Sequence, residues 1–144
     1  MRIREGWFLM FYPVPATILQ GYGLVKQDYR HIVMSRYNTA TEMFICFECL
    51  YGGFKIDLLS AERWSVLESY SVETLIVVTD VRPLDMMLPR LLTCVGAAKH
   101  LLGVRWPLVF TPWQLRSALI KRGMADKFDR NNLTHLEAEE NAVR

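Results

Sequence analysis

Two adjacent glycines, Gly52 and Gly53, constrain the fold of this 144-residue chain more than any other feature. They separate two stretches rich in β-branched and aromatic side chains, Met43 to Tyr51 and Phe54 to Leu59. Glycine adopts the positive φ angles that a two-residue primed turn requires, so the pattern predicts a β-hairpin. His31 to Tyr37 has a similar composition and precedes the hairpin. We therefore expect a three-stranded antiparallel meander in the middle of the chain.

Three helices are expected to pack against this sheet, because each has a capping residue before its first turn. Ser60 caps a helix from Ala61 to about Ser69, Thr93 caps one that begins at Cys94, and Thr111 caps one with Pro112 at its first position. The predicted fold class is α+β, an antiparallel meander sheet with packed helices.

Glycines and prolines mark the remaining boundaries. Gly103 and Gly123 are expected to end the second and third helices, since glycine suits the position after a helix. A further strand is expected at Thr74 to Val81, and the stretch from Arg82 to Arg90, which contains two prolines, is expected to be a loop.

The chain is predicted to be one domain with two flanking segments: an N-terminal docking segment (1–29), a core (30–123) and a polar tail (124–144). The aromatic run Trp7 to Tyr12 is too short to span a bilayer, and Pro13 and Pro15 stop it. We expect this run to be a docking segment or an edge strand, covered by the core or by another subunit. Removing residues 1–15 should then leave a folded and more soluble chain.

Composition and charge exclude several classes of protein. The chain is 51% hydrophobic and 22% charged, which is typical of a packed globule and not of a disordered chain. The net charge of +2, without a nucleic-acid-binding motif, gives no reason to expect a nucleic-acid partner. We expect neither a transmembrane segment nor a cleavable signal, and three cysteines without a disulfide framework favour a reducing cytoplasm or a virion.

Cys94, His31 and Glu48 are the candidate catalytic residues. A thiol in the first turn of a helix meets unpaired N–H groups and the positive end of the helix dipole, which favour the thiolate. A turn centred between Thr39 and Ala40 would set His31 opposite Glu48, as a base and its orienting partner. Each residue also has a plain structural interpretation: Cys94 as a small buried residue, His31 as a strand-end histidine and Glu48 as an exposed carboxylate.

A metal site is the rival interpretation of the cysteines. Cys46 and Cys49 have the spacing of a zinc or redox pair, and Cys94 with His31 or His100 would complete a tetrahedral site. On a regular strand, however, positions 46 and 49 point to opposite faces. We therefore expect neither a metal nor a cofactor.

The segment Thr93 to Lys99, followed by Leu101 to Gly103, resembles the nucleophile helix of papain-like thiol hydrolases of the NlpC type. The order of histidine before cysteine is similar to the circularly permuted branch of that family, in which His31, Glu48 and Cys94 would be the catalytic residues. The resemblance implies a permuted papain-like fold and cleavage of peptide or peptidoglycan amides.

Small relatives of this kind occur among phage tail and head components, so the resemblance also implies a virion-associated protein. The alternative function is a catalytically inert structural or adaptor protein of a phage tail or head assembly. Its partners would be other subunits, bound through Trp7 to Tyr12 and the C-terminal tail.

Overall fold

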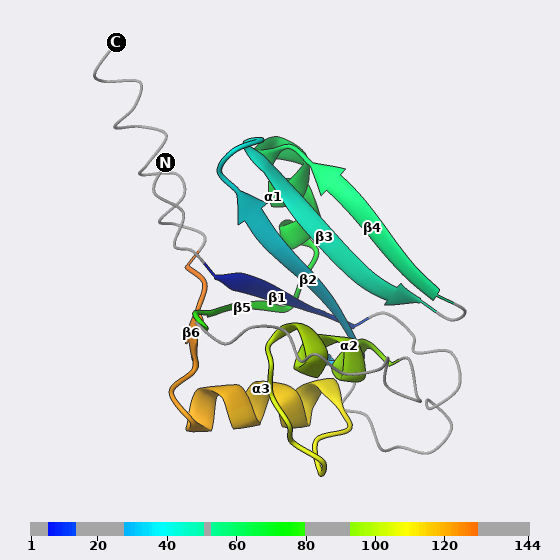
Figure 1. Ribbon diagram of the computed structural model, residues 1–144, viewed down its shortest axis with the longest axis vertical. Helices are drawn as coiled ribbons and strands as arrows, with labels where there is room; N and C mark the ends of the chain where they lie inside the picture. The colour runs from blue at the N-terminus through cyan, green and yellow to red at the C-terminus, as the bar shows by residue number, and fades with distance from the viewer. Residues whose placement is uncertain (1–5, 14–27, 51–52, 80–92, 130–144) are drawn as a thin grey trace.

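The computed structural model describes residues 6–13, 28–50, 53–79 and 93–129. Within these residues the chain is an α+β protein in which helices cover a six-stranded antiparallel sheet (Figure 1). In chain order the elements are β1 (Trp7–Tyr12), β2 (His31–Asn38), β3 (Met43–Leu50), β4 (Gly53–Leu59), α1 (Ala61–Ser69), β5 (Glu73–Val77), α2 (Cys94–Leu101), α3 (Pro112–Lys121) and β6 (Ala125–Lys127). None of the described helices is long and apolar enough to cross a membrane.

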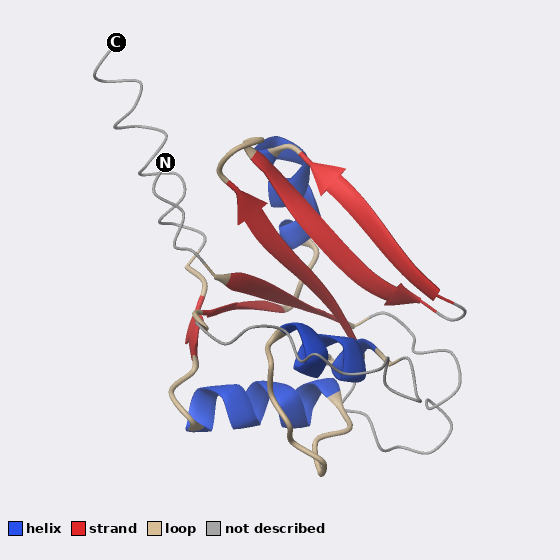
Figure 2. Cartoon of the chain, viewed as in Figure 1, coloured by secondary structure: helices blue, strands red, loops and turns tan. Residues whose placement is uncertain are grey.

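The sheet contains the predicted meander, because β2, β3 and β4 pair in succession as antiparallel neighbours. The strand order across the sheet is β4-β3-β2-β1-β5-β6. β4 therefore forms one edge of the sheet and the short β6 forms the other (Figure 2). Of the predicted Gly52-Gly53 turn, Gly53 opens β4, while residues 51 and 52 lie outside the described residues.

The aromatic run Trp7–Tyr12 is covered by the core, as one of the two alternatives expected, but it is a central strand, so the expectation of an edge strand is wrong. β1 pairs with β2 on one side and with β5 on the other. All six of its residues are buried, and they alternate between the two faces of the sheet. A strand covered on both faces has no polar side to present to water, which explains the uninterrupted apolar run.

Helix α1 covers one face of the sheet, where Trp64 is the central side chain. The Trp64 ring stacks on Phe44 with centroids 4.3 Å apart. Its indole N–H donates a hydrogen bond of 2.8 Å to the Ser35 hydroxyl, so the only polar atom of the indole is satisfied inside the core. Phe8, Met10 and Val33 belong to the same buried cluster.

Helices α2 and α3 cover the opposite face, and their termini follow the predicted capping pattern. The Thr93 hydroxyl accepts a hydrogen bond from the Gly96 N–H at 2.9 Å. Thr111 and Gln114 form a reciprocal capping box at the start of α3. Gly103 and Gly123 follow the two helices with φ angles of 69° and 65°, which glycine adopts without steric cost.

Toward the C-terminal side of the core, the observed boundaries differ from the predicted ones. The strand expected at Thr74 to Val81 is Glu73–Val77, and the predicted loop from Arg82 to Arg90 lies outside the described residues. Ala125–Lys127 pairs with β5, so the core continues past residue 123 into the predicted tail. The rest of that tail, residues 130–144, is not described.

Candidate functional site

His31 and Glu48 meet across β2 and β3, although their register differs from the prediction. The turn spans residues 39–42, and the Asn38 side-chain oxygen accepts hydrogen bonds from the N–H groups of Ala40 and Thr41 at 2.9 and 3.3 Å. This longer turn sets Val33 opposite Glu48. His31 is thus the diagonal neighbour of Glu48 on the same face, and its Nε2 lies 3.0 Å from Glu48 Oε1.

Cys94 packs on the other face of the sheet, and the structure does not bring it to the histidine. His31 pairs with Tyr12 on the face that α1 covers, where Val33 is also buried. Cys94 packs against the cluster of the opposite face, which contains Ile32. A strand alternates its side chains between faces, so the polypeptide of β2 separates the imidazole from the Cys94 thiol.

The Cys94 thiol is hard to ionise, contrary to the expectation of a lowered pKa. Burial raises the pKa of Cys94 to about 11, a hydrogen bond from the Ile32 backbone lowers it by less, and nearby Cys49 adds to the rise. Loss of hydration therefore outweighs the favourable position at the start of α2. A thiol with this pKa supplies very little thiolate at neutral pH.

Cys46 is the thiol that shares a face with His31 and Glu48, and it is not activated either. It lies two residues before Glu48 on β3 and belongs to the buried cluster around Trp64. Burial raises its pKa to about 12, with a smaller contribution from Asp57. Among the described residues, the His31–Glu48 pair therefore has no activated thiol on its own face.

The alternation that separates Cys46 from Cys49 is as predicted. Cys46 packs in the cluster beneath α1, whereas Cys49 faces α2. All three thiols are free. In the part of the chain that the structure describes, no group of three or more histidine, cysteine or acidic side chains is arranged to hold a metal ion.

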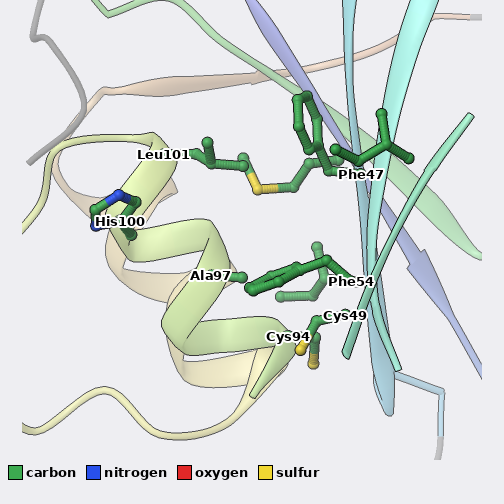
Figure 3. Close-up of a pocket in the computed structure, with 10 residues that line it drawn as sticks. Phe47, Cys49, Phe54, Cys94, Ala97, His100 and Leu101 are labelled. Carbon is green, nitrogen blue, oxygen red and sulfur yellow. The ribbon is translucent and has the colours of Figure 1, made fainter. Parts of the chain in front are cut away.

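An apolar groove lies between α2 and the β3–β4 hairpin, on the Cys94 side of the sheet. Its volume is about 230 Å³. Ala97 and Leu101 project from the helix toward Phe47 and Phe54 on the strands, and Cys94 with Cys49 lies at one end (Figure 3). The remaining lining side chains are Ile32, Met34, Ile56 and His100. No side chain of a Lys, Arg, Asp or Glu is among the lining residues, so the groove suits an apolar group.

The outer wall of the groove is an apolar strand face that the described residues leave uncovered. Phe54, Ile56 and Leu58 of β4 expose 44%, 61% and 61% of their surface. They point to the groove side because their partners on β3 are Cys49, Phe47 and Ile45. Three large apolar side chains in a row on one edge strand are typical of an interaction surface.

Sequence reasoning identified the strand that carries this surface but not its exposure. Phe54 to Leu58 alternates apolar and charged residues, which predicts one buried and one exposed face. The missed signal was chain order: a strand that ends a meander has a free edge unless a later element pairs with it.

The Glu73–Arg116 ion pair, which joins β5 to α3, was missed because its two residues are far apart in the sequence.

Comparisons of the chain with models of known families, with curated proteins and with solved structures found no match.

Proposed function

We propose that this chain is a non-catalytic binding domain within a larger protein assembly, and that its groove binds an apolar segment of a partner protein. The observation that carries the proposal is the groove between α2 and the β3–β4 hairpin, which has no Lys, Arg, Asp or Glu in its lining. Its outer wall, Phe54 and Ile56, continues along β4 into the exposed Leu58. An apolar segment in the groove would remove these side chains from water, which is the main source of binding free energy at such surfaces.

The resemblance to permuted NlpC-type proteins is the basis for two further parts of the proposal. The assembly is a phage tail or head, and the compartment is a virion or the cytoplasm. A permuted papain-like arrangement is part of the same proposal. It is supported by the chain order of the His31 strand, the Glu48 strand and the Cys94 helix, and by the packing of α2 against the sheet. Since function resides in the site and not in the fold, a hydrolase fold can serve assembly after its chemistry has gone.

The second candidate function is the thiol amidase that the resemblance implies, acting on peptide or peptidoglycan amides. The His31–Glu48 contact of 3.0 Å favours it, because a catalytic histidine needs an orienting carboxylate or amide. It also requires Cys94 to reach His31 and to ionise near neutral pH. The opposite faces of β2 and the raised pKa of Cys94 both count against this requirement.

Selection from a library of random peptides displayed on a carrier tests the binding proposal. We expect the selected peptides to be rich in apolar residues and to lose binding to the Ala97→Phe variant, since Ala97 projects into the groove. Val66→Phe is the matched control, because Val66 is exposed on α1, on the opposite side of the sheet. Selected peptides that bind Ala97→Phe as tightly as the wild type would contradict the proposal.

The Cys94→Ala variant separates the two candidate functions. A binding domain keeps its peptide affinity in this variant, because Cys94 contributes only part of the groove wall. An amidase loses all turnover. Rapid labelling of wild-type Cys94 by a thiol-reactive amide mimic at pH 7 would favour the amidase, because a thiol with a pKa of about 11 reacts slowly there.

A further inference from the structure

The edge strand β4 has a sequence that is complementary to itself. From residue 54 it reads Phe54, Lys55, Ile56, Asp57, Leu58, with a cation and an anion placed symmetrically about Ile56. Lys55 and Asp57 point to the opposite face from the apolar side chains, and their charged atoms lie 2.8 Å apart within one chain. Both are substantially exposed, with 53% and 41% of their side-chain surface open to water.

We infer that the partner of this edge is a second copy of the chain, which pairs with β4 antiparallel about a twofold axis through Ile56. In that register Lys55 of each copy lies opposite Asp57 of the other. Phe54 lies opposite Leu58, and Ile56 lies opposite its own counterpart. Directly opposed side chains on antiparallel strands point to the same face and are close enough to interact, so the dimer gains two cross-strand ion pairs and three apolar contacts.

The register is selected by two independent features of β4. The strand runs from Gly53 to Leu59, so Ile56 is its midpoint and this register pairs the whole strand. Moving the axis by one residue places either two Lys55 side chains or two Asp57 side chains opposite each other, which is repulsive. The register with the most backbone pairing is therefore also the one with complementary charges.

Protection of the edge against self-association is weak. Sheet edges are normally shielded by inward charges, prolines or bulges, or by a covering element. β4 contains no proline and pairs regularly with β3 along its whole length. Lys55 alone would discourage pairing of two copies, but Asp57 two residues later turns that repulsion into attraction. A twofold interface of this kind is closed, so it forms a dimer and not a fibre.

The dimer would join two sheets into one of twelve strands, six from each copy. Because opposed residues of antiparallel strands share a face, both grooves would open on the same side of the joint sheet. The inference does not depend on the proposed function. It uses the backbone edge of β4 and the side-chain contacts across that edge, in which Phe54 and Ile56 also take part, whereas the peptide site is the groove that these residues form with α2.

Charge reversal on each side of the pair tests this inference. Asp57→Lys places Lys55 opposite a lysine in both cross-strand pairs, and Lys55→Asp places two aspartates opposite each other. For each variant alone, we expect the dissociation constant of the dimer to rise about tenfold or more, as measured by sedimentation equilibrium at low salt. An equimolar mixture of the two variants should regain the dimer, because every pair is then again of opposite charge.

The matched control is Asp126→Lys, which makes the same charge change on β6, the other edge of the sheet. It should dimerise like the wild type. A wild type that stays monomeric at its highest soluble concentration would overturn the inference, and so would a mixture that does not recover. If a charge variant does not fold, Ile56→Lys replaces it, because it places two lysines on the axis.

Peptide binding by Asp57→Lys keeps this test separate from the proposed function. A variant that is monomeric but still binds the selected apolar peptides supports both proposals. An Asp57→Lys variant that dimerises like the wild type overturns the inferred β4 interface. Its peptide binding then tests the groove alone.

Discussion

Cys94 shows two opposing effects on a single side chain. It occupies the first position of α2, where the helix dipole and unpaired N–H groups favour a thiolate. The same thiol is packed against the sheet, and burial raises its pKa to about 11. Loss of hydration dominates because the thiol lies beside Cys49 at one end of the apolar groove, where the hydrogen bond from the Ile32 backbone offsets only part of its cost.

The raised pKa predicts that Cys94 makes the protein less stable in alkali. In the unfolded chain a thiol loses its proton near pH 8.5 to 9, whereas in the folded protein Cys94 holds it up to about pH 11. The unfolded state binds fewer protons in this window, so the free energy of unfolding falls as pH rises from about 9 to 11. Below that window the contribution of Cys94 is complete.

The Cys94→Ala variant isolates this effect from other groups that titrate in alkali. Between pH 9 and 11 the wild type should lose on the order of 2 kcal/mol more unfolding free energy than Cys94→Ala, measured by urea unfolding at each pH. The comparison uses the change with pH because the alanine variant also differs in packing. Parallel pH profiles for the two proteins would show that the folded thiol titrates normally.

His31 and Glu48 show how far residue reasoning reaches. Their shared face could be predicted, since the observed register differs from the predicted one by an even number of residues and side chains alternate with a period of two. Their diagonal register could not be predicted, because the turn length depends on the Asn38 side-chain hydrogen bonds and on a positive φ at Glu42.

At the scale of elements, local signals predicted the helices well. Ser60, Thr93 and Thr111 all cap helices as expected, because a cap is decided by hydrogen bonds within one turn of chain. The pairing of β5 with β1 and β6 depends on contacts between distant segments. No local pattern reports such contacts, and that is why the positions of Trp7–Tyr12 and Ala125–Lys127 in the sheet were missed.

The Glu73–Arg116 ion pair links helix α3 to strand β5 of the sheet. The Arg116 guanidinium bonds both carboxylate oxygens of Glu73, with Nη2 2.8 Å from Oε1. Both side chains are largely buried, and the guanidinium also lies 4.8 Å from the centre of the Trp113 ring. Burial alone would raise the pKa of Glu73, but the hydrogen bonds and charge of Arg116 outweigh it and hold the pKa below its usual value.

Removing Arg116 should therefore destabilise the protein more than removing the exposed cation beside the same carboxylate. We expect Arg116→Gln to lower the unfolding free energy by about 1–3 kcal/mol, because it leaves a buried carboxylate without its strongest partner. Lys127→Gln is the matched control: Lys127 Nζ lies 3.3 Å from Glu73 Oε1, but its side chain is 69% exposed. Its loss should cost less than about 1 kcal/mol.

The pH dependence of these variants gives the sign of the effect. Since the pKa of Glu73 is lowered on folding, its stabilisation is complete above the pKa of an unfolded carboxyl, about 4.3, and is lost as pH falls through the folded value. The difference between the wild type and Arg116→Gln should shrink with acid. Equal losses from the Arg116 and Lys127 substitutions at pH 7 would show that the bidentate pair has no special role.

At the scale of the whole molecule, β1 is the strand that joins the two halves of the sheet. On one side it pairs with the meander β2–β3–β4, and on the other with β5, which carries β6. Its alternate side chains enter both clusters: Leu9 and Phe11 pack beneath α2 and α3, and Phe8 and Met10 pack beneath α1. Because this strand contributes to both clusters, we expect it to be needed for folding.

A chain that begins at residue 14 should consequently lose cooperative folding, the reverse of what a removable docking segment predicts. Without β1, the facing edges of β2 and β5 lose their backbone partners, and both clusters lose their central side chains.

Leu9→Asp tests the same point within the full-length protein: Leu9 is fully buried, and an unpaired carboxylate there should cost more than about 4 kcal/mol. Leu108→Asp is the control, because Leu108 is 80% exposed and the change should stay within about 0.5 kcal/mol. Thermal unfolding followed by near-ultraviolet circular dichroism reports the packing of the aromatic core directly. A truncated chain that melts cooperatively with the wild-type spectrum would show that the two halves fold without β1.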